Sequence, residues 1–111
     1  GRTATLERGE AYFDVAHERR PFRVHAAAVK VTVHGTRFEV RLEDTRDARV
    51  RVADGIVAVE SPSTGNVVEL RRGQAVDSTS QGRLSTVQPV DPDQVAAWRQ
   101  GSLVYRDAPL Q

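Results

Sequence analysis

Three histidines are the side chains of this 111-residue protein best suited to hold a metal ion. A metal-binding strand would place two histidines one residue apart, with a glutamate soon after them. His17, His25 and His34 do not follow this spacing, and the chain has no cysteine that could supply a thiolate. The sequence therefore predicts no metal centre and no bound cofactor, and it predicts histidines that lie at the surface.

The serines also lack a catalytic arrangement. They cluster in turn-like segments such as 61–66 and 78–83, and none lies in a nucleophile elbow or in a recognisable triad order. Hydroxyls in turns usually bind nearby backbone groups. No glycine-rich loop precedes a helix, so the sequence indicates no phosphate-binding loop. These patterns favour a binding or structural module, and we expect no enzyme activity.

The charges are balanced, with 16 basic and 15 acidic residues and a net charge of +1. Nucleic-acid binding needs a clustered positive face, whereas the basic and acidic residues here alternate along the chain. We therefore expect a mixed, solvated surface and no nucleic-acid partner. Lys30 is the only lysine, and arginine is suited to bidentate contacts with the carboxylates of a partner protein.

Short runs of alternating apolar and polar residues dominate the chain. In the clearest one, 29–33, the valines face one way while Lys30, Thr32 and the following His34 face the other. Turn residues separate the runs every 8 to 12 residues, which is typical of an all-β domain. The predicted strands are 11–15, 22–25, 29–33, 38–42, 48–52, 56–60, 67–70, 74–76 and 84–87.

Four glycines each precede an alternating run, and they are Gly9, Gly35, Gly55 and Gly73. The spacing of the later three predicts rungs stacked in a β-roll or β-solenoid-like arrangement, although an ordinary β-sandwich fits equally well. The dipeptide Asp54-Gly55 is the strongest two-residue turn signal in the chain. It predicts a hairpin that joins strand 48–52 to strand 56–60.

One short helix is predicted near the C-terminus. Asp91 is suited to the N-cap, Pro92 to the first helical position and Gln94 to the third position of a capping box, while Gly101 would end the helix. A strand over 102–106 follows. The residues 107–110 resemble the cap and first turn of a second helix.

Trp98, Leu103 and Tyr105 are the candidate partner-interface residues. Burial of the Trp98 indole against the β-core would stabilise the domain by roughly 3 kcal/mol. Tryptophan is also enriched at the centres of protein interfaces, which is the competing interpretation. Leu103 and Tyr105 share one face of their predicted strand, and the same two interpretations apply to them.

Three segments together resemble the FecR family, whose members are single-pass regulators of extracytoplasmic-function (ECF) sigma factors. They are GEAYFDVA at 9–16, PFRV at 21–24 and VTVHGTRFEV at 31–40. His34 stands where leucine is common in that pattern and Glu39 where asparagine is common, and both are expected to face outward or into turns. The segment WRQGSLVY at 98–105 resembles the opening of the second, STN-like subdomain of these proteins. The resemblance therefore implies a FecR-like β domain over 1–90 and the start of a truncated STN-like subdomain over 91–111.

The resemblance implies a periplasmic sensor domain of an inner-membrane-anchored anti-sigma regulator. The partner would be the signalling domain of a TonB-dependent outer-membrane transducer loaded with a siderophore-type substrate, and a cytoplasmic segment outside this chain would hold the ECF sigma factor. Signalling would then be a protein–protein switch for iron uptake. The alternative is a cell-surface β-module that binds carbohydrate or another small ligand, for which Tyr12 and Tyr105 are the plausible aromatic platforms.

The ends of the chain suggest a segment of a longer protein. It begins in a strand-like run and ends just after the second helix signal. A strand over 103–106 without partners would fray or pair with another chain. We therefore expect self-association that increases with concentration.

Overall fold

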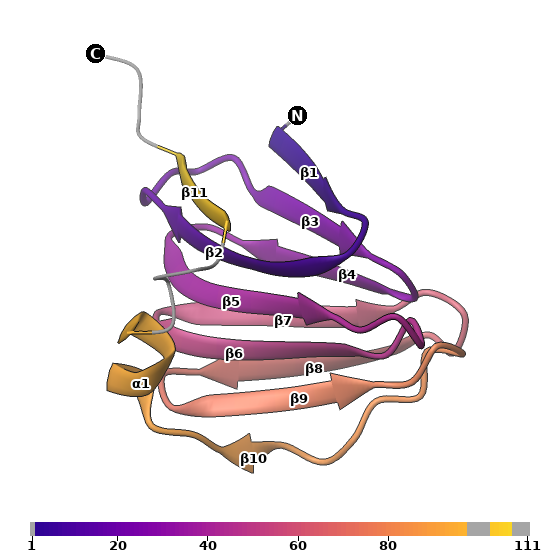
Figure 1. The fold of residues 1–111 in the computed structure, drawn as a ribbon. Helices are drawn as coiled ribbons and strands as arrows, with labels where there is room; N and C mark the ends of the chain where they lie inside the picture. The colour runs from indigo at the N-terminus through magenta and orange to yellow at the C-terminus, as the bar shows by residue number, and fades with distance from the viewer. Residues whose placement is uncertain (1, 98–102, 108–111) are drawn as a thin grey trace.

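The computed structural model describes residues 2–97 and 103–107, the latter as backbone only, and it shows two β-sheets packed face to face (Figure 1). Sheet A contains five strands in the order β1 (Arg2–Leu6), β3 (Phe22–Ala26), β4 (Val29–Val33), β7 (Ile56–Ser61) and β8 (Asn66–Arg71). Sheet B contains six strands in the order β10 (Gln88–Pro89), β9 (Gln74–Ser78), β6 (Ala48–Asp54), β5 (Thr36–Leu42), β2 (Gly9–Val15) and β11 (Leu103–Asp107). With the single described helix α1 (Pro92–Ala97), this arrangement confirms the predicted mainly-β fold with one short helix.

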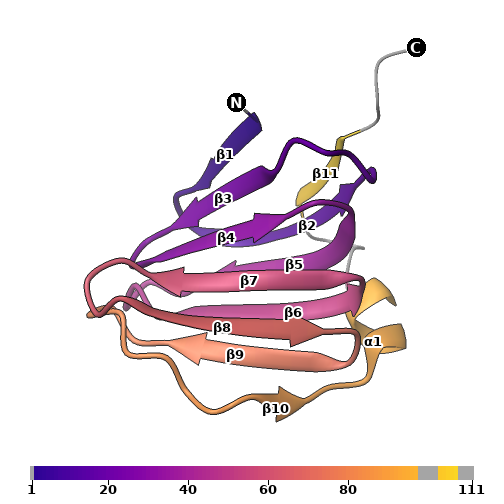
Figure 2. The same cartoon turned by 180° about the vertical axis from the view of Figure 1, so that it is seen from behind.

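Antiparallel hairpins alternate between the two sheets along the chain. The pairs β3–β4 and β7–β8 belong to sheet A, whereas β5–β6 and β9–β10 belong to sheet B. The chain crosses from one sheet to the other between successive hairpins, at the end of the sandwich near α1 (Figures 1 and 2). The fold therefore winds like a roll and packs like a sandwich.

The glycine pattern marks the crossings between sheets. Gly9 begins β2 after β1, and Gly35, Gly55 and Gly73 lie at the β4–β5, β6–β7 and β8–β9 crossings. The predicted Asp54-Gly55 hairpin is therefore wrong, because β6 and β7 lie in different sheets. A two-residue turn signal specifies a local reversal of the chain, but it does not specify which strand each run will pair with.

Valine fills the space between the sheets. Most inward-facing side chains of β4, β6 and β7 are valines, and six of these valines are at most 1% exposed: Val31, Val33, Val50, Val52, Val57 and Val59. The phenylalanines add one aromatic cluster, since the Phe13 ring stacks on the Phe38 ring with 5.0 Å between centroids. β-Branched side chains pack well on a pleated surface, so the period-2 valine runs account for both the strands and the core.

The C-terminal elements agree with the sequence only in part. The Asp91 carboxylate accepts a hydrogen bond of 2.9 Å from the Asp93 backbone N–H, which confirms the predicted N-cap of α1. The predicted strand 84–87 is wrong, because Leu84 makes one isolated bridge to Ser78 and the strand β10 begins only at Gln88. The predicted helix end at Gly101 and residues 108–110 of the predicted second helix lie outside the described residues.

Strand β11 has a partner within the chain. It pairs in parallel with β2, and Leu103 lies opposite Ala11 while Tyr105 lies opposite Phe13. The expectation that this strand would lack a partner is therefore wrong. Asp107, predicted to cap a second helix, is the last residue of β11.

Candidate partner-binding surface

Helix α1 covers part of the outer face of sheet B. Its buried Val95 packs with Tyr12 of β2 and Ala53 of β6. Tyr12 faces away from the sandwich core, as its strand position predicts, but it packs with Val95 of α1 and is buried. Tyr12 therefore does not form the exposed aromatic platform that the carbohydrate-binding alternative requires.

Cross-strand ion pairs occupy the rest of the outer face of sheet B. Arg49 forms a bidentate contact with Asp77, with distances of 2.7 and 3.1 Å, and it also donates to Gln88 over 3.0 Å. The hydrogen bond to Asp77 raises the pKa of Arg49. The pairs on this face are Asp14–Arg37, Glu10–Arg41, Glu39–Arg51 and Arg49–Asp77. Because these charges neutralise one another, this face offers little net charge to a partner.

Glu39 and Arg51 form a buried ion pair. They lie directly opposite each other on β5 and β6, and their side chains are 0% and 2% exposed. Burial lowers the pKa of Arg51, while the charges of Glu10 and Asp77 act in the opposite direction. Glu39 points away from the sandwich core, as the sequence predicts, but this part of the face is covered and the side chain is buried.

The outer face of sheet A is open. No described helix or loop crosses it (Figure 2). Lys30, Thr32 and His34 face outward here, as the sequence predicts, and Ile56 and Val67 are 47% and 60% exposed. Ile56 lies at one end of the β7–β8 pair, opposite Arg71, and Val67 lies near the other end, opposite Glu60.

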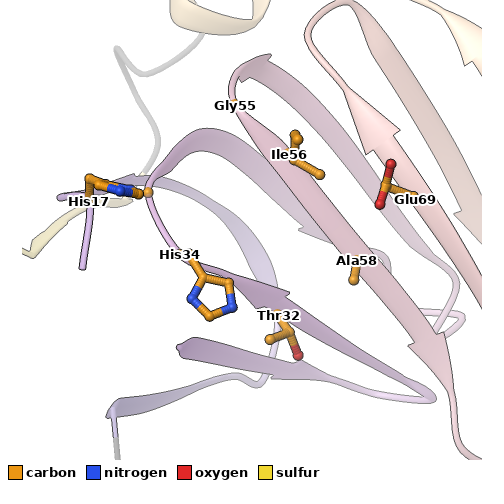
Figure 3. A pocket seen from close by; sticks show the side chains of 8 residues that line it. His17, Thr32, His34, Gly55, Ile56, Ala58 and Glu69 are labelled. Carbon is orange, nitrogen blue, oxygen red and sulfur yellow. The ribbon is translucent and has the colours of Figure 1, made fainter. Parts of the chain in front are cut away.

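A groove of about 450 Å³ lies on this open face at the crossing end of the sandwich. Ile56 and Ala58 of β7 form its floor together with Thr32 of β4, while the histidines and Glu69 stand at its rim (Figure 3). Its lining residues are His17, Thr32, His34, Gly35, Gly55, Ile56, Ala58 and Glu69. The apolar floor and polar rim suit one apolar side chain of a partner.

The 16–21 loop builds one wall of the groove. The Glu18 N–H donates to the His34 carbonyl over 2.8 Å, and His34 Nδ1 lies 3.2 Å from the Arg19 carbonyl. Since a carbonyl only accepts, Nδ1 must carry the proton in this contact. A Cβ on Gly35 would lie 2.6 Å from His17 Cα, so a side chain there would push the loop away. The wall is therefore fixed by close backbone packing.

Two arginines lie next to the groove. Among the described residues, neither Arg19 nor Arg23 forms an ion pair, and Arg23 lies directly opposite the groove residue Thr32. The nearby Lys30 and Arg71 are paired with Glu60 and Glu69 at 3.1 and 2.9 Å. This balance favours a partner that presents carboxylates around an apolar side chain.

Two of the three predicted interface residues lie in the described part of the chain, away from the groove. Trp98 is outside the described residues. Leu103 and Tyr105 belong to β11 at the edge of sheet B, whereas the groove lies on sheet A. Ile56 is not among the predicted site residues, although the sequence carries a signal for it: it is a large apolar residue in the outward phase of a strand whose inward positions are Val57 and Val59.

The described residues show neither a metal site nor a membrane-spanning helix. Within 2–97 and 103–107, no group of three or more histidine or acidic side chains lies close enough to hold a metal ion. His25 lies opposite Lys30 on β4, whereas His34 follows the far end of that strand, so these two histidines do not form a pair. No helix in the described part of the chain has the length and apolar character to cross a membrane.

The two wound, packed sheets place the chain in the class of all-β double-sheet domains. A family model described as FecR protein matches residues 1–58, and the chain belongs to the FecR family. Two crystal structures of candidate anti-sigma factors from Parabacteroides distasonis ATCC 8503 are similar to it, with 29% and 28% sequence identity and TM-scores of 0.73 and 0.74. The alignments cover 87% and 91% of this chain but 46% and 48% of theirs, so the chain spans about half the length of these structures. No curated protein matches it.

Proposed function

We propose that this domain is the periplasmic sensor region of a membrane-anchored anti-sigma regulator. It receives a signal from the signalling domain of a TonB-dependent outer-membrane transducer and relays it toward an ECF sigma factor, in siderophore-type iron signalling. Membership of the FecR family and the likeness to candidate anti-sigma factors support this proposal. The mechanism is a change of protein contacts on a rigid β-scaffold.

One observation carries the proposal. The family match over residues 1–58 includes every groove-lining residue except Glu69. The groove is thus built almost wholly from the segment that defines the family, and it lies on the sheet face that no described element covers. A regulator that works by contact needs such an accessible face.

The proposal also divides the chain into two parts. Residues 1–90 form the FecR-like β domain, and residues 91–111 begin an STN-like subdomain. Trp98, Leu103 and Tyr105 then belong to a second contact surface that is available to the same transducer domain. Leu103 and Tyr105 lie on sheet B, whereas the groove lies on sheet A.

The substitution Ile56→Glu tests the groove as a contact site. It places a carboxylate on the apolar floor, where a partner's carboxylates would repel it, so we expect at least about tenfold weaker binding of the transducer signalling domain. Isothermal titration with the signalling domains of the TonB-dependent transducers of the same organism measures this change. Thr5→Glu is the matched control, because Thr5 is exposed on the same face but on the edge strand β1. Equal affinities for the wild type and Ile56→Glu would contradict the role of the groove.

The carbohydrate-binding alternative finds less support in the structure. Sugar rings stack on exposed aromatic faces, whereas Tyr12 is buried and none of the described Phe, Tyr or Trp residues lines the groove. We therefore favour a protein partner.

A further inference from the structure

Sheet A ends one strand short of sheet B on the side of β8. Strand β8 is the last strand of sheet A and faces β6 and β9 of sheet B. Sheet B continues beyond β9 with β10, which lies at the outermost position on this side (Figure 1). We call the space beside β8 and opposite β10 the open slot. It has the width of one strand, because β10 is the one described strand of sheet B beyond β9.

Two apolar side chains border the open slot. Val87 directly precedes β10 on this side of sheet B, and its side chain is 41% exposed. Val67 of β8, at 60% exposure, borders the slot on the outer side. With Ile56, they are the large apolar side chains exposed in the described part of the chain.

The backbone of β8 is available for pairing along this edge. Among the strands that the structure describes, β8 pairs with β7 alone, so alternate residues turn their N–H and C=O groups outward. The Arg71 N–H is in this outward phase, because it donates to the Gln74 side chain over 2.8 Å. Val67 and Glu69 share the phase of Arg71, and their backbone groups therefore face the slot.

We propose that β8 accepts an extended segment of a partner protein as a sixth strand of sheet A. This inference rests on the proposed function, since it names a further contact by which the regulator would be engaged. Strand addition derives affinity from main-chain hydrogen bonds and specificity from alternate side chains. In the partner's added strand, the residues that face Val87 are apolar, and the alternate residues, which face away from it, are polar.

A second copy of this chain does not fit the slot. Pairing of two β8 edges about a two-fold axis would place each copy's β10 where the other copy's β9 lies, because sheet B overhangs sheet A by one strand in both copies. A single strand without a backing layer has no such conflict. Arg72 and Arg83, near the two ends of the slot, form no ion pair within the described residues, which favours carboxylates at the ends of the segment.

The probe is a fluorescein-labelled peptide that matches β8 in length, at six residues, with alternating valine and threonine between terminal glutamates. Fluorescence anisotropy measures its binding, and amide hydrogen exchange by NMR locates it. We expect saturable binding below about 1 mM and at least tenfold slower exchange at Val67 and Glu69. No binding up to about 1 mM would overturn the inference and leave the transducer titration at the groove unaffected.

Two N-methylated peptides separate strand addition from contact through side chains alone. One carries N-methyl groups on the amides of one strand phase and the other on the amides of the opposite phase. Only one phase faces β8, so we expect one of the two peptides to lose binding at least tenfold and the other to retain it. Equal binding by both would overturn the proposal.

Val87→Glu tests the slot from the protein side. A carboxylate opposite the apolar phase of the peptide should weaken binding at least tenfold, while Ile56→Glu in the groove should leave peptide binding unchanged. Val87 is exposed, so thermal melts should show a fold as stable as the wild type. Loss in both variants, or in neither, would contradict the open slot as the site.

Discussion

Replacement of Glu39 by glutamine is expected to lower the free energy of unfolding by about 3 kcal/mol, because it leaves the guanidinium of Arg51 buried opposite a neutral group. Glutamine keeps the shape of the side chain, so packing changes little. The charges of Glu10 and Asp77 reach Arg51 from the same face but do not replace a direct partner. Urea unfolding should show a lower midpoint with an unchanged slope.

The sheet supplies a matched control for this effect. Asp14 and Arg37 lie directly opposite each other on the same outer face, 3.5 Å apart, but their side chains are 36% and 59% exposed. Asp14→Asn should therefore cost less than about 1 kcal/mol. Equal costs for Glu39→Gln and Asp14→Asn would show that burial does not set the strength of the Glu39 pair.

A double substitution separates charge from packing. The variant Glu39→Leu with Arg51→Met removes both charges and keeps apolar volume, and buried ion pairs replaced in this way are often neutral or stabilising. We expect its stability to lie within about 1 kcal/mol of the wild type. A large loss would instead indicate that the carboxylate and guanidinium satisfy neighbouring polar groups which apolar side chains cannot.

The strands of this domain could be predicted from the sequence because each depends on local alternation. Every run of valine at period 2 through residue 76 became a strand, and inward and outward positions such as Val31 and Thr32 were assigned correctly. The pairing of the strands could not be predicted, since it depends on which runs cover each other's apolar faces. Asp54-Gly55 illustrates this limit: the turn signal is real, but the chain uses it to change sheets.

The candidate site was less predictable than the fold. The sequence predicts that Glu39 faces outward, which it does, but a strand position does not reveal whether other residues will cover that face. The groove is lined by residues of the 16–21 loop and of strands β4, β7 and β8, which are far apart in the sequence. No spacing of residues within one segment could therefore predict it. Trp98 is a predicted interface residue because of its residue type alone. Ile56 could not be predicted in the same way, because its role depends on the outer face of sheet A being uncovered.

The substitution Gly55→Ala should destabilise the domain by about 3 kcal/mol, since strain and a close backbone contact act together. Gly55 adopts φ of +94°, and a Cβ there would lie 2.7 Å from the Gly35 carbonyl oxygen and 3.0 Å from Thr36 Oγ1. An L-residue at this φ is strained by roughly 1–3 kcal/mol, and the contact with a backbone oxygen cannot be relieved by a side-chain rotation. Thermal and urea unfolding measure the loss.

Gly65→Ala isolates the close approach from the backbone strain. Gly65 also has a positive φ, of +77°, but a Cβ added there would meet no other atom within 4 Å. Its substitution should therefore cost only about 1 kcal/mol, from strain alone. Similar losses at Gly55 and Gly65 would contradict the view that the β4–β5 and β6–β7 crossings can lie in contact only because Gly55 has no side chain.

Gly35 and Gly55 both line the groove. The contact between the two crossings therefore also shapes the groove, and we expect Gly55→Ala to change the NMR chemical shifts of His17 and Thr32.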